Sequence, residues 1–321
     1  MISLITTVLN ESNNLADWLD GVLSQTVLPE EIIIVDGGSK DGTWEMLQEK
    51  SRQNNLIKVW QHHGNISAGR NFAIAKAQGE IIVVTDAGCN YDINWFKKIV
   101  EPILSGQADF AATGFGPWFK PEDSLLTRLI AAATTPAPLE FKRNWLPSSR
   151  SVAFRKEVWQ QAGGYPEWIP LCEDVVFDLK IFKLGIKTAY IREPLVFWRP
   201  RTTLKNYFKQ LFGYTRSDGH GKLWLKRQMT RYAFYSVNII LLYLGLKTGW
   251  LLAVALLFAW LDYLRKFWKR WFVYSQKLSL VSKIVGFILL PLVVIYGDMA
   301  KMCGWPVGVY ERKIGKIKFQ P

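Results

Sequence analysis

The sequence IIVVTDAGC, at residues 81–89, decides the fold of the first half of this chain. Four apolar β-formers run into a polar turn that carries Asp86, which is the pattern of a buried strand ending at the rim of a sheet. Residues 32–38 repeat this pattern as IIIVDGG and end on Asp36. Because ligands bind beyond the carboxyl ends of strands in open α/β sheets, the two acids indicate a nucleotide site, a metal site or both.

Strand and helix patterns alternate around these two acids. The expected strands cover residues 3–9, 31–36, 56–60 and 81–85. The expected helices between them cover residues 15–23, 44–52 and 68–78. This is the spacing of βαβ units with right-handed crossovers, so we predict an α/β domain with a mostly parallel central sheet. Further on, residues 173–184 are typical of a helix, and 188–191 and 195–198 of two short edge strands.

The two halves of the chain differ in charge. Residues 1–198 contain 19 Lys and Arg against 23 Asp and Glu, whereas residues 199–321 contain 21 against 4. The whole chain is 49% hydrophobic and holds 15 Trp. A basic, apolar second half predicts contact with an anionic membrane surface. Nucleic acid is not expected as a partner, because the basic residues flank apolar helices and do not form a separate patch.

Composition divides the second half again. Residues 199–231 hold nine Lys and Arg among Leu, Tyr and Phe, which is typical of an amphipathic helix at a membrane interface. Residues 232–321 contain three uncharged runs of 15, 14 and 14 residues, shorter than the ~20 that span a bilayer. We therefore predict a catalytic domain over 1–198, an interfacial segment over 199–231, and membrane-embedded helices with a basic tail over 232–321.

The topology of these runs stays open at this level. The runs at 232–246 and 248–261 form either a hairpin that turns near Gly249 or one long tilted helix. The basic clusters at 265–270 and 312–318 both indicate the cytoplasmic side. At least one run is therefore expected to be re-entrant or interfacial, and the run with Pro291 is a candidate.

The compartment follows from cysteines and from the N-terminal residues. The three cysteines are scattered and form no CxxC pair, which fits a reducing compartment and indicates neither a disulfide framework nor a zinc site. Residues 1–5 resemble the start of a strand and not a signal peptide. We expect a protein of the cell membrane whose catalytic domain faces the cytoplasm.

Several acids and one arginine are candidates for chemistry. Asp36 lies in a strand-to-helix turn with glycines, where its carboxylate suits a base N–H or a ribose hydroxyl. Asp86 is the metal candidate, because a carboxylate beside a diphosphate binds it through Mg²⁺ or Mn²⁺. Arg70 opens a helix, where it meets either an anion or a carboxylate such as Asp86. Glu173 and Asp174 start a helix, where they act either as capping acids or, one of them, as a general base.

Histidine chemistry is not expected. The chain contains three histidines, two at the end of a strand and His220 in a glycine-rich stretch. We expect all three at the surface.

Five motifs, in order and at matching spacing, resemble family 2 glycosyltransferases. They are TTVLNE (6–11), IIIVDGGSKDGT (32–43), SAGRNFAIAKAQGEIIVVTDAGC (67–89), SVAFRKEVWQQAGGYPE (151–167) and CEDVVFDLKIFKLG (172–185). The resemblance covers nearly all of residues 1–198. It implies the Rossmann-like glycosyltransferase A-type fold, a nucleotide-sugar donor and inversion at the anomeric carbon.

The resemblance also implies roles for single residues. Thr7, Asn10 and Glu11 would lie in the first nucleotide-binding loop, and Asp36 would hold the pyrimidine or the ribose. Asp86 matches the first acid of the DxD motif, and Asp174 matches the acid that takes the proton of the acceptor hydroxyl. The third DxD position is Gly88, so a divalent cation, Mg²⁺ or Mn²⁺, would rest on Asp86 alone, and a basic residue such as Arg70 would share the neutralisation of the diphosphate.

The expected function is a membrane-associated, inverting glycosyltransferase of the hexosyltransferase type. It would use a nucleotide-sugar, with UDP-sugar as the first choice because of Asp36, and a lipid-linked or cell-surface glycan as acceptor. Two other functions stay open. A sugar nucleotidyltransferase would need a Gly-rich, basic N-terminal loop and no membrane helices. A membrane scaffold that has lost turnover would explain Gly88.

Overall fold

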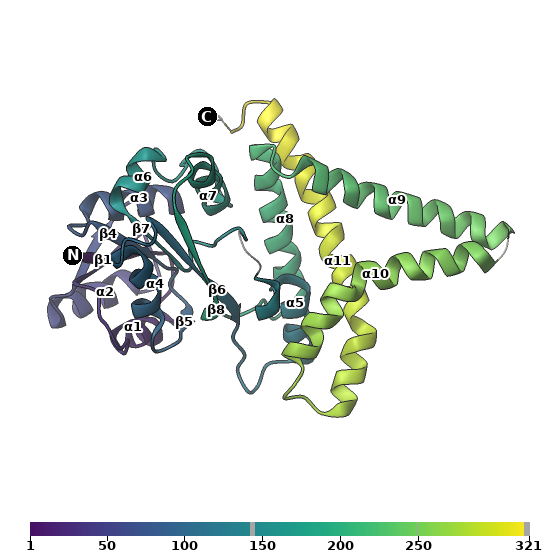
Figure 1. Cartoon of the computed structure of the whole chain (residues 1–321), viewed down its shortest axis with the longest axis horizontal. Helices are drawn as coiled ribbons and strands as arrows, with labels where there is room; N and C mark the ends of the chain where they lie inside the picture. The colour runs from purple at the N-terminus through teal and green to yellow at the C-terminus, as the bar shows by residue number, and fades with distance from the viewer. Residues whose placement is uncertain (142–144, 249, 318–321) are drawn as a thin grey trace. The chain divides into compact units, whose positions relative to one another are not determined.

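The computed structural model describes residues 1–141, 145–248 and 250–317 (Figure 1). These residues form two compact units. The first comprises Met1–Trp118 and Pro138–Arg199, and the second comprises Phe119–Ala137 and the helices that follow Pro200. The domain boundaries expected from composition stay predictions, and the structure adds that residues 119–137 group with the helical unit.

The first unit is built on an eight-stranded sheet with the order β3-β2-β1-β4-β7-β6-β8-β5. Its strands are β1 (Ile2–Val8), β2 (Glu31–Asp36), β3 (Ile57–Gln61), β4 (Ile81–Val84), β5 (Cys89–Tyr91), β6 (Phe110–Pro117), β7 (Val152–Arg155) and β8 (Thr188–Trp198). Strands β3, β2, β1 and β4 are parallel, β8 is parallel to β6, and β7 and β5 run antiparallel to their neighbours. The predicted α/β fold with a mostly parallel sheet is confirmed.

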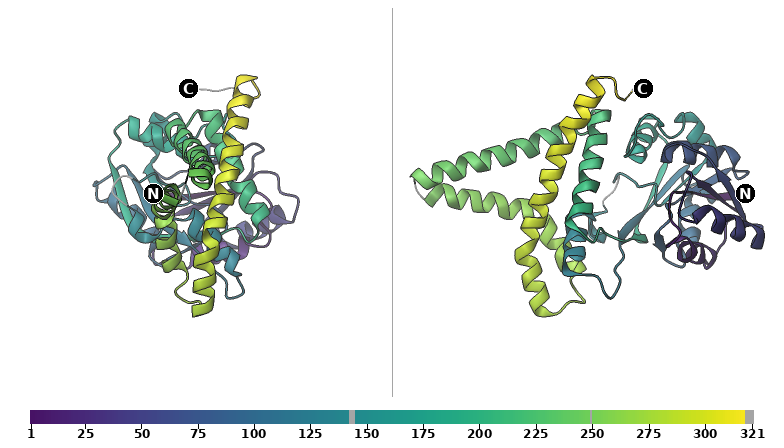
Figure 2. Two further views of the ribbon diagram at one scale, coloured as in Figure 1. Left: turned by 90° about the vertical axis from the view of Figure 1, so that its right-hand side faces the viewer. Right: turned by 180° about the vertical axis from the view of Figure 1, so that it is seen from behind.

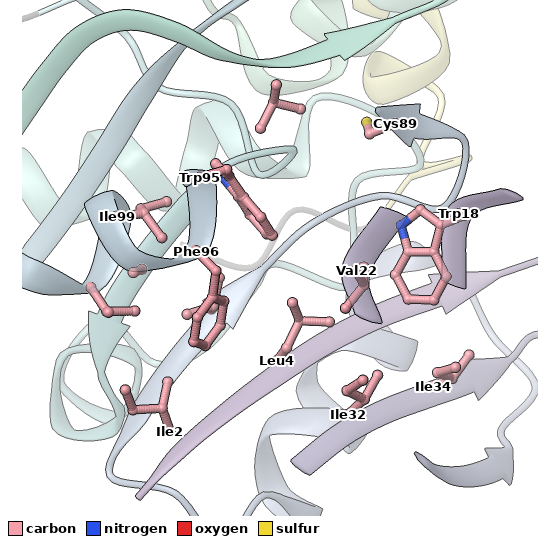
Figure 3. Packing of buried hydrophobic residues seen from close by; sticks show 14 of the residues in the cluster. Ile2, Leu4, Trp18, Val22, Ile32, Ile34, Cys89, Trp95, Phe96 and Ile99 are labelled. Carbon is pink, nitrogen blue, oxygen red and sulfur yellow. The ribbon is translucent and has the colours of Figure 1, made fainter. Parts of the chain in front are cut away.

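Helices cover both faces of this sheet. They are α1 (Leu15–Leu23), α2 (Thr43–Gln53), α3 (Ile66–Lys76), α4 (Trp95–Leu104), α6 (Lys156–Gln161) and α7 (Glu173–Lys183). Successive strand residues point to opposite faces, so Ile32 and Ile34 join one core cluster while Ile33 and Val35 join the other. Figure 3 shows the first cluster, in which Trp18 and Trp95 lie among the aliphatic side chains of the strands.

The last strand differs from our prediction. Residues 188–198 form one strand, β8, and not two short ones. The pairing with β6 slips between Thr113 and Gly114, so that Arg192 and Glu193 bulge out of the ladder. A Cβ at Gly114 would lie 2.5 Å from Arg192 O, so glycine is required at this bulge. The polar bulge resembles a strand break in the sequence, which explains the error.

The second unit is helical. Its helices are α5 (Leu125–Thr134), α8 (Leu204–Gly221), α9 (Leu225–Thr248), α10 (Trp250–Tyr274) and α11 (Leu280–Lys313). The ring of Phe234 on α9 stacks on Tyr263 of α10 at 4.7 Å, so these two helices pack as a hairpin, as Figure 2 shows. Of the two arrangements left open by the sequence, the structure has the hairpin; Gly249 and residues 318–321 of the basic tail lie outside the described residues.

Helices α8 and α11 pack backbone to backbone. A Cβ at Gly308 of α11 would lie 1.8 Å from Arg216 O on α8, so only glycine permits this approach. The close packing buries His220, whose Nε2 lies 2.9 Å from Glu311 Oε2. The expectation of a surface His220 is therefore wrong, because its glycine-rich stretch is part of a helix and not a turn.

One helix in the described part of the chain, α11, is long and apolar enough to cross a bilayer by length and composition. Pro291 lies inside this continuous helix.

Candidate functional site at the sheet edge

Three parallel strands bring the predicted site residues to one edge of the sheet. Val8 at the end of β1 pairs in register with Asp36 at the end of β2. On the other side of β1, Thr85 at the end of β4 donates its N–H to Ile5 O at 3.2 Å. The carboxyl ends of β1, β2 and β4 are therefore neighbours, which places Asp36 and Asp86 at the same edge.

Asp36 shapes the loop that follows it. Its side chain is buried and accepts hydrogen bonds from Gly38 N, from Ser39 N and Oγ, and from Gln61 Nε2 at 3.0 Å. The carboxylate thus holds three groups of its own loop and one side chain from β3. A ligand N–H that reaches Asp36 has to compete with Gln61 for Oδ2.

The loop after β1 is joined to the loop after β2. Asn10 has a left-handed backbone (φ 56°), donates its N–H to Ser39 Oγ at 2.8 Å and accepts from Lys40 N at 2.9 Å. Glu11 N donates to Thr43 Oγ1 at 2.9 Å. These bonds fix the geometry of both loops, as expected of a binding loop positioned by a rigid scaffold.

Thr7 marks the point where helix α3 comes closest to β1. A Cβ at Gly69 would lie 2.8 Å from Thr7 Cγ2, so the glycine lets the start of α3 approach the strand. The next residue on α3, Arg70, therefore lies close to the strand, and it is buried. The structure therefore assigns Thr7 a packing contact with the segment that carries Arg70.

Arg70 connects two acids that are far apart in the sequence. Its Nη2 donates to Asp86 Oδ1 at 2.6 Å, and its Nη1 donates to Glu173 Oε1 at 2.6 Å. Its guanidinium lies 5.2 Å from the centre of the Tyr165 ring. Burial works against the charge of Arg70, but Asp86 and Glu173 outweigh it and raise the pKa of the guanidinium. Of the two partners expected for Arg70, an anion or a carboxylate, the structure has carboxylates.

A second arginine faces Asp86. Arg150 Nε lies 3.6 Å from Asp86 Oδ2, and its guanidinium stacks on Trp198 at 4.5 Å. Burial would raise the pKa of Asp86, but Arg70 and Arg150 together hold it below its ordinary value. Arg150 was not among the predicted site residues. The only signal for it is the basic residue within SSRS (148–151), just before β7.

These surroundings do not fit a metal ion. Both carboxylate oxygens of Asp86 face guanidinium groups, and Gly88 supplies no second carboxylate. Nowhere in the described ranges do three His, Cys, Asp or Glu side chains gather to hold a metal. Two cations beside a lone carboxylate disfavour Mg²⁺ or Mn²⁺, which bind through carboxylates and substrate phosphates.

The two acids at the start of α7 have different environments. Glu173 is buried and paired with Arg70, and burial raises its pKa against the attraction of that arginine. Asp174 is half-buried, accepts from Val175 N at 2.9 Å and lies 3.5 Å from Ser148 Oγ. No Lys or Arg among the described residues forms an ion pair with it. Cys172, directly before the pair, has a left-handed backbone (φ 61°), a strained conformation often found at functional sites.

The buried acid Asp178 was not among the predicted site residues. Asp178 lies one turn after Asp174 on α7 and is 1% exposed, and neither of its carboxylate oxygens has a hydrogen-bond partner among the residues that the structure describes. Burial, followed by the charge of Asp174, raises the pKa of Asp178 well above its ordinary value. In the sequence, the repeat of an acid at i and i+4 on an apolar helix is the signal that could have indicated it.

The first part of the chain is similar to a known protein family. Residues 3–154 match the family described as Glycosyl transferase family 2. Succinoglycan biosynthesis protein ExoA of Rhizobium meliloti is 25% identical over 234 residues, which cover 70% of this chain and 70% of that protein. O-antigen chain rhamnosyltransferase RfbN of Salmonella typhimurium is 25% identical over 227 residues, which cover 64% of this chain and 70% of that protein.

A solved structure shares the fold. The mannosyltransferase PcManGT from Pyrobaculum calidifontis, in complex with GDP-Man and Mn²⁺, is 16% identical and superposes with a TM-score of 0.53, covering 98% of this chain and 87% of that one. At this identity the likeness concerns the fold alone, which is of the glycosyltransferase A type. Residues 3–154 therefore form a family 2 glycosyltransferase domain.

Proposed function

We propose that this protein is a membrane-associated, inverting glycosyltransferase. It transfers a hexosyl group from a nucleotide-sugar to a lipid-linked or cell-surface glycan, with its catalytic domain on the cytoplasmic side of the cell membrane. The acceptor hydroxyl oxygen attacks C1 of the donor sugar, the bond from C1 to the diphosphate oxygen breaks, and the nucleoside diphosphate leaves. The proton of the acceptor hydroxyl passes to Asp174.

The observation that carries this proposal is the difference in pairing between Glu173 and Asp174. Arg70 holds Glu173 in a buried ion pair at 2.6 Å, so its carboxylate is occupied. Asp174, half-buried at the helix start, keeps a carboxylate that no described arginine or lysine neutralises. A general base must have a free lone pair within reach of the acceptor. We therefore assign the base to Asp174 and a positioning role to Glu173.

We assign the neutralisation of the negative charge on the leaving diphosphate to arginine side chains. Because the Asp86 surroundings do not fit a metal ion, the proposal contains no step through Mg²⁺ or Mn²⁺. Arg150 is the more exposed of the two guanidinium groups on Asp86, with 26% of its side chain accessible against 2% for Arg70. A cation at this place stabilises negative charge that develops on the leaving group.

The donor and acceptor are proposed from chemistry and from the relatives. Asp36 favours a UDP-sugar, whose uracil N–H can replace the Gln61 bond. The two relatives named above are a succinoglycan biosynthesis protein and an O-antigen chain rhamnosyltransferase, which supports a glycan acceptor. Membrane association is supported by the apolar helix α11 and by the basic second half of the chain.

The test is sugar transfer by the full chain in detergent. Each UDP- and GDP-sugar is supplied with lipid extract as acceptor, and labelled product and released nucleotide are measured. For an α-linked donor, we expect NMR to show the β-anomer as the first product. Asp174→Asn should lower turnover by about 10²- to 10⁴-fold, whereas Asp20→Asn, the same change at an exposed site on α1, should not.

Three results would contradict the proposal or one of its parts. Retention of the α-configuration would exclude direct displacement by the acceptor. Binding of a donor without any turnover in wild type would favour the scaffold alternative, and Asp174→Asn with wild-type turnover would remove Asp174 as the base.

A further inference from the structure

The second unit contains a pocket that the proposed chemistry does not use. It lies at the start of the α9–α10 hairpin and has a volume of about 550 Å³. Its walls combine rings with cationic side chains. They are formed chiefly by Trp224, Phe234, Tyr263, Lys226, Arg227 and Arg231.

The cations of the pocket are only partly neutralised. Arg227 Nη2 lies 3.4 Å from Asp218 Oδ2, and Arg231 Nε lies 3.4 Å from Asp298 Oδ1. Both acids are buried, with 6% and 1% of their side chains exposed, whereas 58% of the Arg227 side chain is accessible. Lys226 is exposed, and in the part of the chain that the structure describes no carboxylate pairs with it. The accessible charge of the pocket is therefore positive.

The aromatic walls are apolar and well supported. Arg227 lies over the Trp224 ring at 5.1 Å, and Phe234 stacks on Tyr263 at 4.7 Å. Tyr235 donates to Asp298 Oδ2 at 3.0 Å and Tyr263 donates to the same oxygen, so the hairpin is anchored behind the pocket. The pocket thus offers a rigid apolar wall beside accessible cations.

The pocket lies where the charged part of α9 meets its apolar part. No charged residue occurs between Arg231 and Lys247, a stretch of about 22 Å along the helix axis at 1.5 Å per residue. Beyond the pocket, apolar side chains are open to solvent: Val237 is 50% exposed and Ile240 is 56% exposed. A continuous exposed apolar face next to a cationic pocket is a surface for an amphiphile.

We propose that this pocket binds a membrane lipid through its phosphate group. Lys226, Arg227 and Arg231 contact the phosphate oxygens, the first part of the tail packs on Phe234 and Tyr263, and the rest follows the exposed face of α9. A soluble phosphate would use the cations and leave the apolar walls bare, so the amphiphile accounts for both. The proposal rests on the membrane association proposed above but not on glycosyl transfer.

The test measures lipid binding by the full chain in a neutral detergent, with native mass spectrometry. The probes are two matched pairs: phosphatidic acid with diacylglycerol, and a polyisoprenyl monophosphate with the corresponding polyisoprenol. We expect at least one phosphate lipid to bind about tenfold or more tightly than its phosphate-free partner. The preferred tail tells a structural phospholipid from a lipid carrier of the acceptor.

Variants locate the site. Lys226→Gln with Arg227→Gln removes two cations, and Thr230→Trp fills the pocket without changing charge. Both should weaken phosphate-lipid binding about tenfold. Lys205→Gln with Lys209→Gln removes two exposed cations of α8 outside the pocket and should leave binding within twofold. Circular dichroism of each variant checks that the helices are retained.

The proposal is overturned if the pocket variants bind like wild type, or if the α8 control weakens binding as much. Equal binding of a lipid with and without phosphate would show a plain apolar crevice. Glycerol phosphate that displaces the lipid at equal concentration would show a site for soluble phosphate. If the wild-type protein binds the phosphate lipid but shows no glycosyl transfer, the proposed function is contradicted and this inference still holds.

Discussion

Arg70 on α3 and Glu173 on α7 form a buried ion pair at 2.6 Å across 103 positions of the sequence. The same guanidinium holds Asp86 at the end of β4 at 2.6 Å. One arginine thus sets the distance between the strand end that would meet the donor and the helix start that would meet the acceptor.

Replacing Arg70 should damage both stability and activity. Arg70→Met leaves Glu173 without the cation of its ion pair and leaves Asp86 with Arg150 as its remaining cation. Breaking such a buried pair costs about 3–5 kcal/mol. We expect a lower unfolding temperature of the full chain in detergent and turnover below detection. Arg70→Lys keeps the charge but can hold only one acid well. Its unfolding temperature and its turnover should therefore lie between those of Arg70→Met and wild type. A fully active Arg70→Met would contradict the positioning role.

Glu173 and Asp174 should differ in what they affect. Glu173→Gln removes the partner of Arg70 and should lower the unfolding temperature while reducing turnover less than tenfold. Asp174→Asn should leave the unfolding temperature within error and remove the proton acceptor. Thermal unfolding and single-turnover kinetics on both variants make this comparison. The reverse pattern would assign the base to Glu173.

Metal removal should have a small effect. Arg70 and Arg150 already place two positive charges on Asp86, so EDTA is expected to lower turnover less than tenfold. Arg150→Gln should lower it much more. Complete loss in EDTA, restored by Mn²⁺ and not by Ca²⁺, would show that Asp86 exchanges the arginines for a cation as the DxD resemblance implies.

Asp178 should make stability fall as pH rises. Its carboxyl ionises near pH 4 in the unfolded chain, whereas burial and Asp174 keep its pKa well above that in the folded unit. Between these values the folded state binds more protons, so each pH unit costs up to about 1.4 kcal/mol. Asp178→Asn removes this cost. Its gain in unfolding temperature should be larger at pH 8 than at pH 4.5, and an equal gain at both would contradict the raised pKa.

Gly308 should be intolerant of even one methyl group. A Cβ there would lie 1.8 Å from Arg216 O and force α8 and α11 apart. We expect Gly308→Ala to lower the unfolding temperature of the full chain clearly, as overpacking costs about 1–3 kcal/mol. Gly315→Ala is the comparison, because a Cβ there meets no neighbour within 4 Å. Its positive φ of 72° adds local strain, so any loss should stay smaller than at Gly308.

Local sequence was sufficient for much of the first unit. The runs of Ile and Val that end on Asp36 and Asp86 predicted the strands and the shared sheet edge, because burial on both faces demands continuous apolar residues. It failed at β8, where the polar bulge at Arg192 and Glu193 depends on pairing with a distant strand. It failed at His220, because the close contact of two glycine-bearing helices is invisible in either helix alone.

The roles of the acids depended on the fold. Spacing placed Glu173 and Asp174 together at a helix start, but which of them is paired follows from Arg70, a residue 103 positions away. Arg150 and Asp178 have only weak signals in the sequence. The role of Arg150 follows from its ion pair with Asp86, and that of Asp178 from its burial without a hydrogen-bond partner among the described residues. The sequence by itself determined the sheet, the acids at its edge and the basic apolar second half, since these follow from local periodicity and composition. Only the tertiary structure decided which charges neutralise each other, because that depends on distances between segments that the chain order does not encode.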